Sequence, residues 1–215
     1  MTKSVAPPRA MRAVTLAFGL LFLTVSAPPA QADRCPPPER TKQETVEVVR
    51  GERAALYYVT EHDNGTDYGH SFACNRRTGR VHTLDDDVPM SRAATAFAGP
   101  YAAFVFHRPE PIINCTGVAL VDIRTGDQRD VTNECNDGTA DQDQVFFRIA
   151  LLSTGTVAWT VPQGVFAAQR PAASGELPAR RQLGGPTGLR KLTLRAGRRS
   201  FCWRVFDKER CSRAD

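Results

Sequence analysis

Apolar residues along the chain occur in short runs, with no sustained helical period. The runs are rich in Val, Phe, Tyr and Thr, and clusters of Gly, Pro, Asn and Asp separate them. They read TVEVV, AALYYVT, YAAFVFH, GVALVDI, TVAWTVP, GVFAAQ and KLTLRA. Because predicted strands follow one another without intervening helices, the pattern predicts an all-β protein.

Two sequence features recur along the chain. The segment NRRTGRVHTL around Gly79 matches DIRTGDQRDV around Gly126, 47 residues later, and RPAASGELPARRQL around Gly175 is a looser third copy. We expect each of these glycines to lie in a turn that joins the third and fourth strands of a repeated unit.

The second feature is a glycine followed three residues later by a small residue and then by an aromatic one. The glycines are Gly51, Gly99, Gly155 and Gly197. The small residues are Ala54, Ala102, Ala158 and Ser200, and the aromatic residues are Tyr57, Phe104, Trp159, Phe201 and Trp203. We expect the glycine to lie in a hairpin turn, the small residues to occupy equivalent positions, and the aromatic to fill the space between neighbouring sheets.

Repeated units of hairpins at this spacing predict a propeller-like array of three to four short antiparallel blades, with a β-sandwich as the alternative. The runs LLSTGTVAWTV, SGELPARRQL and GLRKLTLRAGRRSFCW resemble degenerate WD-type or TolB-like propeller repeats of small exported bacterial proteins. The resemblance covers most of residues 44–206, but no Trp-Asp dipeptide is present. It implies a propeller or a propeller fragment, and most such families have no assigned activity.

The N-terminus has the pattern of a secretory signal peptide. Lys3, Arg9 and Arg12 precede an apolar stretch at 13–25, and Ala30-Gln31-Ala32 is a small-x-small cleavage site. The apolar stretch is short for a membrane span, so an uncleaved anchor is the less favoured alternative. We therefore predict a signal peptide at 1–32, one exported domain at 33–215, and no stable membrane insertion after cleavage.

Charge is unevenly distributed over this predicted mature chain. Residues 33–150 contain 13 basic and 19 acidic side chains, whereas residues 151–215 contain 12 and 4. The basic part could contact an anionic polymer or a lipid surface. A solvated face, or a partner for the acidic half of the same fold, is the interpretation that the sequence favours.

All six cysteines lie after residue 32, which favours disulfides in an exported protein. A three-residue loop at the RTG turn, with Gly126 left-handed, pairs residues whose numbers sum to 250, and Cys115 and Cys135 meet that condition. Cys202 and Cys211 flank a short predicted loop at Val205–Lys208 and are expected to pair likewise. Cys35 and Cys74 then remain and would tie the N-terminal segment to the first blade.

No common catalytic motif is present: there is no G-x-S-x-G, H-E-x-x-H, P-loop or S-x-x-K pattern. The four histidines are scattered, at positions 62, 70, 82 and 107. His62 and His70, with Asp63 and Asp67, could form a metal site, but a polar surface loop is favoured. Cys74 near His70 is better explained as a disulfide cysteine than as a nucleophile.

Two acidic clusters complete the candidate chemistry. Asp85–Asp87 is predicted to be a solvated loop, and the segment with Asp137, Asp141 and Asp143 lacks the regular spacing of a calcium loop. Asn64 and Asn114 match the glycosylation acceptor pattern, and their meaning depends on the host. We predict no cofactor, no metal and no nucleic-acid partner.

Three functions remain open on the sequence. The favoured one is an exported binding or interaction module for an unknown protein or envelope polymer. The alternative is an extracellular hydrolase with a site built from loops, for which His62, Asp63 and Asp85–Asp87 are the available residues. The third is a structural envelope component. Between three and four blades fit the chain, so we expect an open monomer or a weak homodimer in preference to a closed ring.

Overall fold

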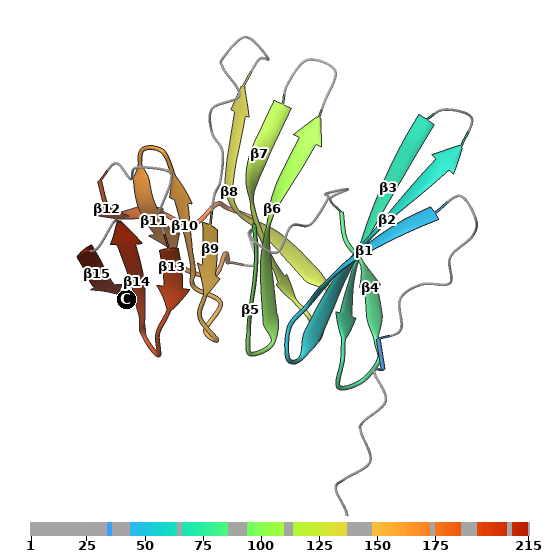
Figure 1. The fold of residues 1–215 in the computed structure, drawn as a ribbon, viewed down its shortest axis with the longest axis horizontal. Coiled ribbons are helices and arrows are strands. Elements are labelled where there is room, and N and C mark those ends of the chain that lie inside the picture. Colours follow the sequence, from blue (N-terminus) through green and yellow to red (C-terminus); the bar gives the residue numbers. More distant parts are fainter. Residues whose placement is uncertain are drawn as a thin grey trace, which may run out of the picture. The chain divides into compact units, whose positions relative to one another are not determined.

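The computed structural model describes residues 34–35, 44–63, 66–85, 94–109, 114–136, 148–172, 175–185, 193–205 and 208–214. The regular elements in these ranges are β-strands arranged in four antiparallel sheets (Figure 1). This confirms the predicted fold class, an all-β, propeller-like array of short blades with disulfide clasps. In the described part of the chain, no helix has the length and apolarity needed to cross a membrane.

Each sheet is a simple meander of consecutive strands. The first sheet contains β1 (Glu44–Arg50), β2 (Ala54–Asp63), β3 (Thr66–Asn75) and β4 (Val81–Thr83). The second contains β5 (Thr95–Ala98), β6 (Tyr101–Pro109), β7 (Asn114–Asp122) and β8 (Asp127–Asn136). The third contains β9 (Arg148–Leu151), β10 (Val157–Val161), β11 (Gly164–Ala168) and β12 (Arg181–Gly184). The fourth has three strands, β13 (Thr193–Ala196), β14 (Ser200–Val205) and β15 (Lys208–Arg213).

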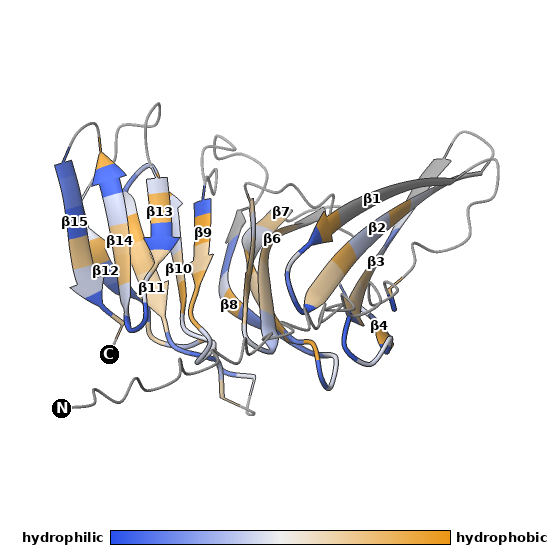
Figure 2. Cartoon of the chain, turned by 60° about the horizontal axis from the view of Figure 1, so that its bottom comes forward, coloured by the Kyte–Doolittle hydropathy of each residue, from blue (hydrophilic) through white to orange (hydrophobic). Residues whose placement is uncertain are grey.

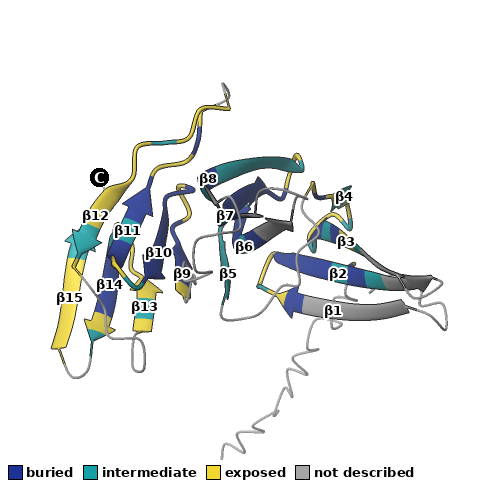
Figure 3. Cartoon of the chain, turned by 90° about the horizontal axis from the view of Figure 1, so that it is seen from above, coloured by how far each residue is buried: buried dark blue, intermediate teal, exposed yellow. Residues whose placement is uncertain are grey.

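Consecutive sheets pack face to face through apolar side chains. Alternate residues of β6 show this most clearly: Phe104 and Phe106 pack against the first sheet, whereas Tyr101 and Ala103 pack against the third. Phe201 of β14 packs in the same way against the third sheet. The inner strands of the middle sheets are therefore buried on both faces (Figure 3), and β10 is buried along its whole length.

The predicted aromatic repeat is confirmed at one position of each sheet. In the first hairpin of each sheet, we call the first residue that pairs after the loop the closing residue. The four closing residues are Ala54, Tyr101, Thr156 and Ser200. Counting from the closing residue, the fourth residue is aromatic and buried in every sheet: Tyr57, Phe104, Trp159 and Trp203. Three of the four side chains fill the space toward the preceding sheet. Tyr57 lies in the first sheet, which has no preceding sheet. Its side chain packs instead against Cys35 and donates a hydrogen bond to the carbonyl oxygen of Cys35.

The predicted equivalence of the four small residues is wrong. Ala54 and Ser200 close their hairpins, but Ala102 lies one residue and Ala158 two residues beyond the closing position. Ala102 consequently faces the preceding sheet, while Ala158 faces the following one. The cause is that the glycines occupy different positions in their turns. Gly99 and Gly155 lie inside the loop, with positive φ of 57° and 89°. Gly51 and Gly197 lie at the start of the loop, and their amides donate hydrogen bonds to the carbonyls of the closing residues.

A hydrogen bond between two turns provides further evidence of a repeated unit. After the third strand, a backbone amide donates to the carbonyl of the last loop residue of the first hairpin. The three bonds are Arg76 to Arg53 (3.0 Å), Ile123 to Pro100 (2.8 Å) and Ala214 to Arg199 (3.0 Å). The first, second and fourth sheets therefore share this closure, and Arg170 occupies the corresponding position in the third sheet.

The register of the β7–β8 hairpin places Cys115 opposite Cys135 as predicted, but for a different reason. The loop contains four residues, because Asp122 pairs with Asp127. In the pairs next to the loop, the two residue numbers therefore sum to 249. A β-bulge between Val118 and Ala119 leaves Val131 as the extra residue and restores the sum of 250 at the cysteines. The bulge also adds Val131 to the core between the second and third sheets.

Two disulfides lie on the first and last sheets. Cys35 joins Cys74 with a Cα–Cα distance of 6.0 Å, and Cys202 joins Cys211 across β14 and β15 with a distance of 4.1 Å. The β14–β15 pairing continues to Val205 and Lys208, so the loop has two residues and is shorter than predicted. The side chain of Cys135 lies outside the described residues, and its bond to Cys115 stays a prediction.

Candidate ligand-binding site

The two RTG turns fold into the same local structure. In each, the side chain of the residue that ends the third strand, Asn75 or Asp122, accepts a hydrogen bond from the backbone amide two residues later (both 3.0 Å). Its carbonyl accepts the amide of Gly79 (2.7 Å) or Gly126 (2.8 Å), and these glycines have φ of 78° and 81°. The threonine hydroxyls accept the amides of Arg80 and Asp127, both at 3.3 Å.

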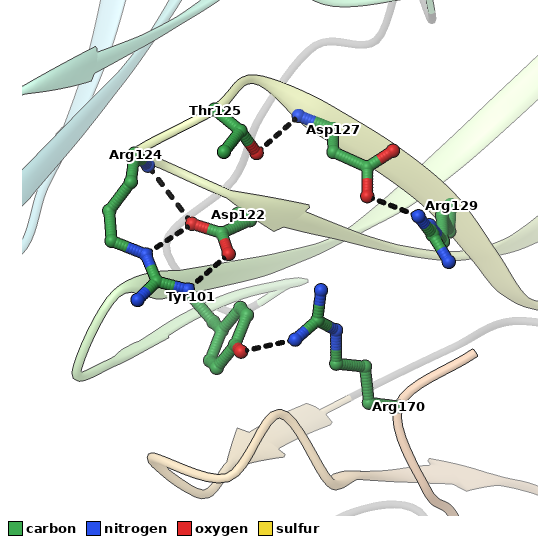
Figure 4. Close-up of polar contacts among 7 residues, drawn as sticks. All are labelled: Tyr101, Asp122, Arg124, Thr125, Asp127, Arg129 and Arg170. Carbon is green, nitrogen blue, oxygen red and sulfur yellow. Dashed lines mark hydrogen bonds and ion pairs between the residues drawn. The ribbon is translucent and has the colours of Figure 1, made fainter. Parts of the chain in front are cut away.

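The second turn contains an ion pair (Figure 4). The first turn cannot form it, because Asn75 stands there in place of Asp122. Arg124 donates from Nε (2.9 Å) and Nη2 (2.6 Å) to the carboxylate of Asp122, whose side chain is 5% exposed. The hydrogen bond from Arg124 is the main cause that lowers the pKa of Asp122, and the same contact raises the pKa of Arg124. Asp122 is thus held ionised and fully engaged.

Arg170 reaches this network from the third sheet. Its Nη1 donates to the hydroxyl of Tyr101 (2.7 Å), and its guanidinium lies 5.2 Å from the centre of the tyrosine ring (Figure 4). In the described part of the chain, Arg170 forms no salt bridge, and the carboxylate of Asp122 is already paired with Arg124. The guanidinium of Arg170 therefore keeps donors available for an added anion.

The third sheet departs from the repeat after Arg170. Where the first two sheets have an RTG turn, β11 and β12 are joined by the segment 169–180. Gly175 is left-handed here too, with φ of 76°, but it lies in this longer connection. We call residues 169–180 the connecting segment. Long connections of this kind in compact folds commonly carry function.

Arginines fasten the connecting segment to its surroundings. Arg129 donates to the carbonyl of Pro171 (3.4 Å) and pairs with Asp127 (2.5 Å). Arg180 pairs with Glu134, and its guanidinium lies 5.4 Å from the centre of the Phe166 ring. The segment is thus held near its start by a hydrogen bond and the Arg170–Tyr101 cation–π contact, and at its end by an ion pair and a cation–π contact.

Two grooves flank the connecting segment, and Leu177, which is 47% exposed, lines both. One has a volume of about 560 Å³, a floor of alanines and a rim with Arg170, Glu176 and Arg181; we call it the basic groove. The other has a volume of about 420 Å³ and contains Asp85, Gln128, Arg129, Asp130 and Asn133. A small cavity beside Tyr101 has a volume of about 10 Å³, which is room for about one water molecule.

The residues proposed for a hydrolase are not brought together in the described part of the chain. His62 pairs in register with Asp67 in the β2–β3 hairpin, but the side chains of His62, Asp63 and Asp67 lie outside the described residues. His70 is exposed, and Asp85 is exposed at the edge of the second groove. No group of three or more potential metal ligands occurs among the described side chains.

Other predicted candidates lie outside the described residues. These are Asp86, Asp87, Asn64, Asp137, Asp141, Asp143 and the side chains of His107 and Asn114.

His82 is the predicted candidate that the structure shows packed against another sheet. Its ring lies against Gly126, and its Nε2 is buried with no hydrogen-bond partner among the described residues. Burial, followed by the charge of Arg80, lowers the pKa of His82.

Sequence reasoning missed the Tyr101–Arg170 contact and the two grooves. The available signal was the third repeat copy, in which a Pro-Ala-Ala-Ser-Gly stretch replaces the compact RTG turn. A repeat that loses its turn chemistry at one position marks an insertion. The contact itself joins residues 69 positions apart on different sheets, and no local pattern encodes it.

No family model and no curated protein sequence matches the chain. Among solved structures, it is similar to the β-propeller domain of the Trilobed protease from Pyrococcus furiosus, with 8% identity and a TM-score of 0.46 over 81% of this chain and 58% of that one. It is also similar to acylaminoacyl peptidase in complex with Z-Gly-Gly-Phe-chloromethyl ketone, with 10% identity and a TM-score of 0.44 over 80% of this chain and 33% of that one. The chain spans less than two thirds of either structure.

Proposed function

We propose that the protein is an exported binding module, related to the WD-type or TolB-like propeller proteins of bacteria, that holds a carboxylate-bearing partner in the basic groove. Cys35–Cys74 and Cys202–Cys211 support export, because disulfides persist in oxidising compartments. The predicted signal peptide at 1–32 belongs to the same proposal.

The observation that carries this proposal is the position of Arg170. Its guanidinium is anchored through neutral contacts with Tyr101, and it borders the basic groove. Anchoring fixes the guanidinium, which lowers the entropic cost of binding an anion. The charge of Arg170 also helps to lower the pKa of Asp122, so Asp122 compensates part of it, while the guanidinium forms no salt bridge in the described part of the chain. A carboxylate suits this site because a guanidinium can bind it with two parallel hydrogen bonds.

The floor of the basic groove indicates an extended ligand. The buried Ala167 and Ala168 and the exposed Ala179 are small side chains that allow a backbone to approach closely, and the exposed Leu177 offers an apolar contact. Arg170 and Arg181 outnumber Glu176, so the rim has a net positive charge. We therefore infer that the partner presents an extended acidic peptide.

Fluorescence anisotropy with a fluorescein-labelled tetraglutamate peptide tests the proposal on the purified chain 33–215. We expect Arg170→Gln to weaken binding about tenfold, because a charge-assisted hydrogen bond of about 1.4 kcal/mol is lost. Arg148→Gln is the matched control, since Arg148 is an exposed arginine of β9 in the same sheet and does not line the basic groove.

Equal affinity of the wild type and Arg170→Gln, or equal loss in Arg148→Gln, would contradict the assignment of the groove. Absence of tetraglutamate binding together with binding of tetralysine would contradict the sign of the ligand charge. A weak homodimer also stays a prediction, and light scattering of the same chain across salt concentrations tests it separately.

A further inference from the structure

The fourth sheet turns a strongly basic face away from the third sheet. Phe201 and Trp203 of β14 pack against the third sheet, so the alternate residues of the fourth sheet point the other way. We call this opposite side the outer face. Its residues are Thr193, Arg195, Ser200, Cys202, Arg204, Glu209, Cys211 and Arg213. Figure 3 shows β15 exposed along its length, and Figure 2 shows it largely hydrophilic.

Three arginines lie in three consecutive rows of the outer face, each on a different strand. Arg213 lies opposite Ser200, Arg195 lies opposite Cys202, and Arg204 occupies the next position of β14 on that face. Each row of the face therefore has one arginine, and consecutive rows are two residues apart, which is about 6.8 Å along an antiparallel strand. The Cys202–Cys211 disulfide lies in the middle row and fixes the two strands that carry Arg204 and Arg213.

Little of this positive charge is neutralised within the chain. Residues 193–214 contain seven basic and two acidic side chains, and all seven basic residues are exposed. Glu209 pairs with Arg195, with Nε and Nη2 at 3.0 and 2.9 Å from its carboxylate. In the described part of the chain, no salt bridge involves Arg198, Arg199, Arg204, Lys208, Arg210 or Arg213.

We propose that the outer face of the fourth sheet binds a linear phosphodiester polymer, with one phosphate for each arginine row. The arginines of the face are exposed and lie in separate rows, so a polymer can contact more of them than a single small anion can. A flexible polymer with closely repeated charges would contact Arg204 and Arg213 together, and its phosphates would compete with Glu209 for Arg195. Each guanidinium can bind two oxygens of one phosphate, and release of counterions favours the complex.

The arginines of this surface differ from those of the basic groove. Arg195, Arg204 and Arg213 do not line that groove, although the neighbouring Ala214 does and Arg181 of the groove donates to the backbone carbonyl of Arg213. The two proposals can therefore fail independently. Polymer binding would place the protein on an anionic envelope polymer, while the groove would remain available to a protein partner.

The test measures binding of the chain 33–215 to synthetic poly(glycerol phosphate) by isothermal titration calorimetry at several salt concentrations. For Arg204→Gln/Arg213→Gln we expect about tenfold weaker binding and a salt slope reduced by about two, one for each lost phosphate contact. Arg53→Gln/Arg148→Gln removes the same charge from exposed positions outside the fourth sheet and should leave affinity nearly unchanged.

Thermal unfolding of both double variants provides the folding control, because each changes only exposed side chains and should retain the wild-type Tm. The proposal is overturned by a wild type that does not bind the polymer, or by equal losses in the two double variants. It is also overturned if phosphatidylglycerol vesicles bind and poly(glycerol phosphate) does not, since a lipid surface would then be the ligand. Equal binding of poly-L-glutamate would contradict the choice of phosphate.

Discussion

The ring of His82 packs directly against Gly126, although the two residues belong to different sheets. A Cβ atom added to Gly126 would lie 2.4 Å from Nδ1 of His82, and the backbone of Gly126 is left-handed with φ of 81°. His82 lies on β4, the strand that follows the first RTG turn, whereas Gly126 ends the second RTG turn. The first and second sheets thus pack against each other at the point where the segments of the two RTG turns meet.

Gly126→Ala should destabilise the fold more than Gly175→Ala. Both glycines have left-handed φ, so each substitution costs about 1 kcal/mol in backbone conformation. Only Gly126 adds a steric clash, because nothing lies within 4 Å of a Cβ at Gly175. We expect a total of about 3 kcal/mol for Gly126→Ala, measured by urea unfolding. Equal midpoints for the two variants would contradict the packing of His82 on the turn.

His82 should make stability depend on pH in mildly acidic solution. Burial lowers its pKa from the ordinary value of 6.5, so the unfolded chain binds more protons than the folded one between the two pKa values. The contribution of neutral His82 is therefore complete above about pH 6.5 and is lost as the pH falls below it. Urea midpoints at pH 7.5 and 5.5 should differ less in His82→Gln than in the wild type. The exposed His70, changed to Gln, is the control and should retain the wild-type difference.

Asp122→Asn should be tolerated better than Asp122→Ala. The first RTG turn has Asn75 at this position, and its Oδ1 accepts the amide of Arg77 just as Asp122 accepts that of Arg124. Asparagine thus preserves the turn and loses the ion pair with the exposed Arg124, at a cost of about 1 kcal/mol or less. Alanine also leaves the backbone amide of Arg124 without its acceptor, so we expect about 2 kcal/mol. Calorimetric Tm values provide the measurement, and similar losses in both variants would show that the ion pair dominates.

Much of the fold could be predicted because its determinants are local. The RTG turns require a left-handed glycine and an Asx acceptor, and Tyr57, Phe104, Trp159 and Trp203 recur in the same register. What could not be predicted depends on contacts between distant residues. The bulge at Val131 is selected by burial against the third sheet, and the alignment of Ala102 with Ala54 failed because loops of different length preserve the same aromatic position.

The candidate site was harder still to predict from the sequence. The approach of Arg170 to Tyr101 depends on two sheets packing together, and neither residue belongs to a recognised motif. The hydrolase candidates were chosen because His and Asp are common catalytic residues, but residue type without a shared location carries little information. By contrast, the count of basic residues after position 150 did anticipate the basic fourth sheet, because exposed strands tolerate charge without further constraint.

The disulfides should differ in their contribution to stability and in their ease of reduction. Cys35 and Cys74 are 39 residues apart and Cys202 and Cys211 are 9 apart, so the first closes the longer loop of the unfolded chain. Chain entropy predicts a loss of about 4 kcal/mol for Cys35→Ser/Cys74→Ser and about 3 kcal/mol for Cys202→Ser/Cys211→Ser. Cys35 and Cys74 are fully buried whereas Cys211 is exposed, so a mild thiol reductant should open Cys202–Cys211 first.

Non-reducing peptide mapping of the exported protein checks the pairing on which this ranking depends, including the predicted Cys115–Cys135 bond. The β7–β8 register places those two residues directly opposite each other, so their peptides should remain linked. With the four-residue turn, the bulge is needed for that alignment, because without it Glu134 would lie opposite Cys115. A peptide that links Cys115 to any other cysteine would therefore contradict the hairpin register together with the bulge at Val131.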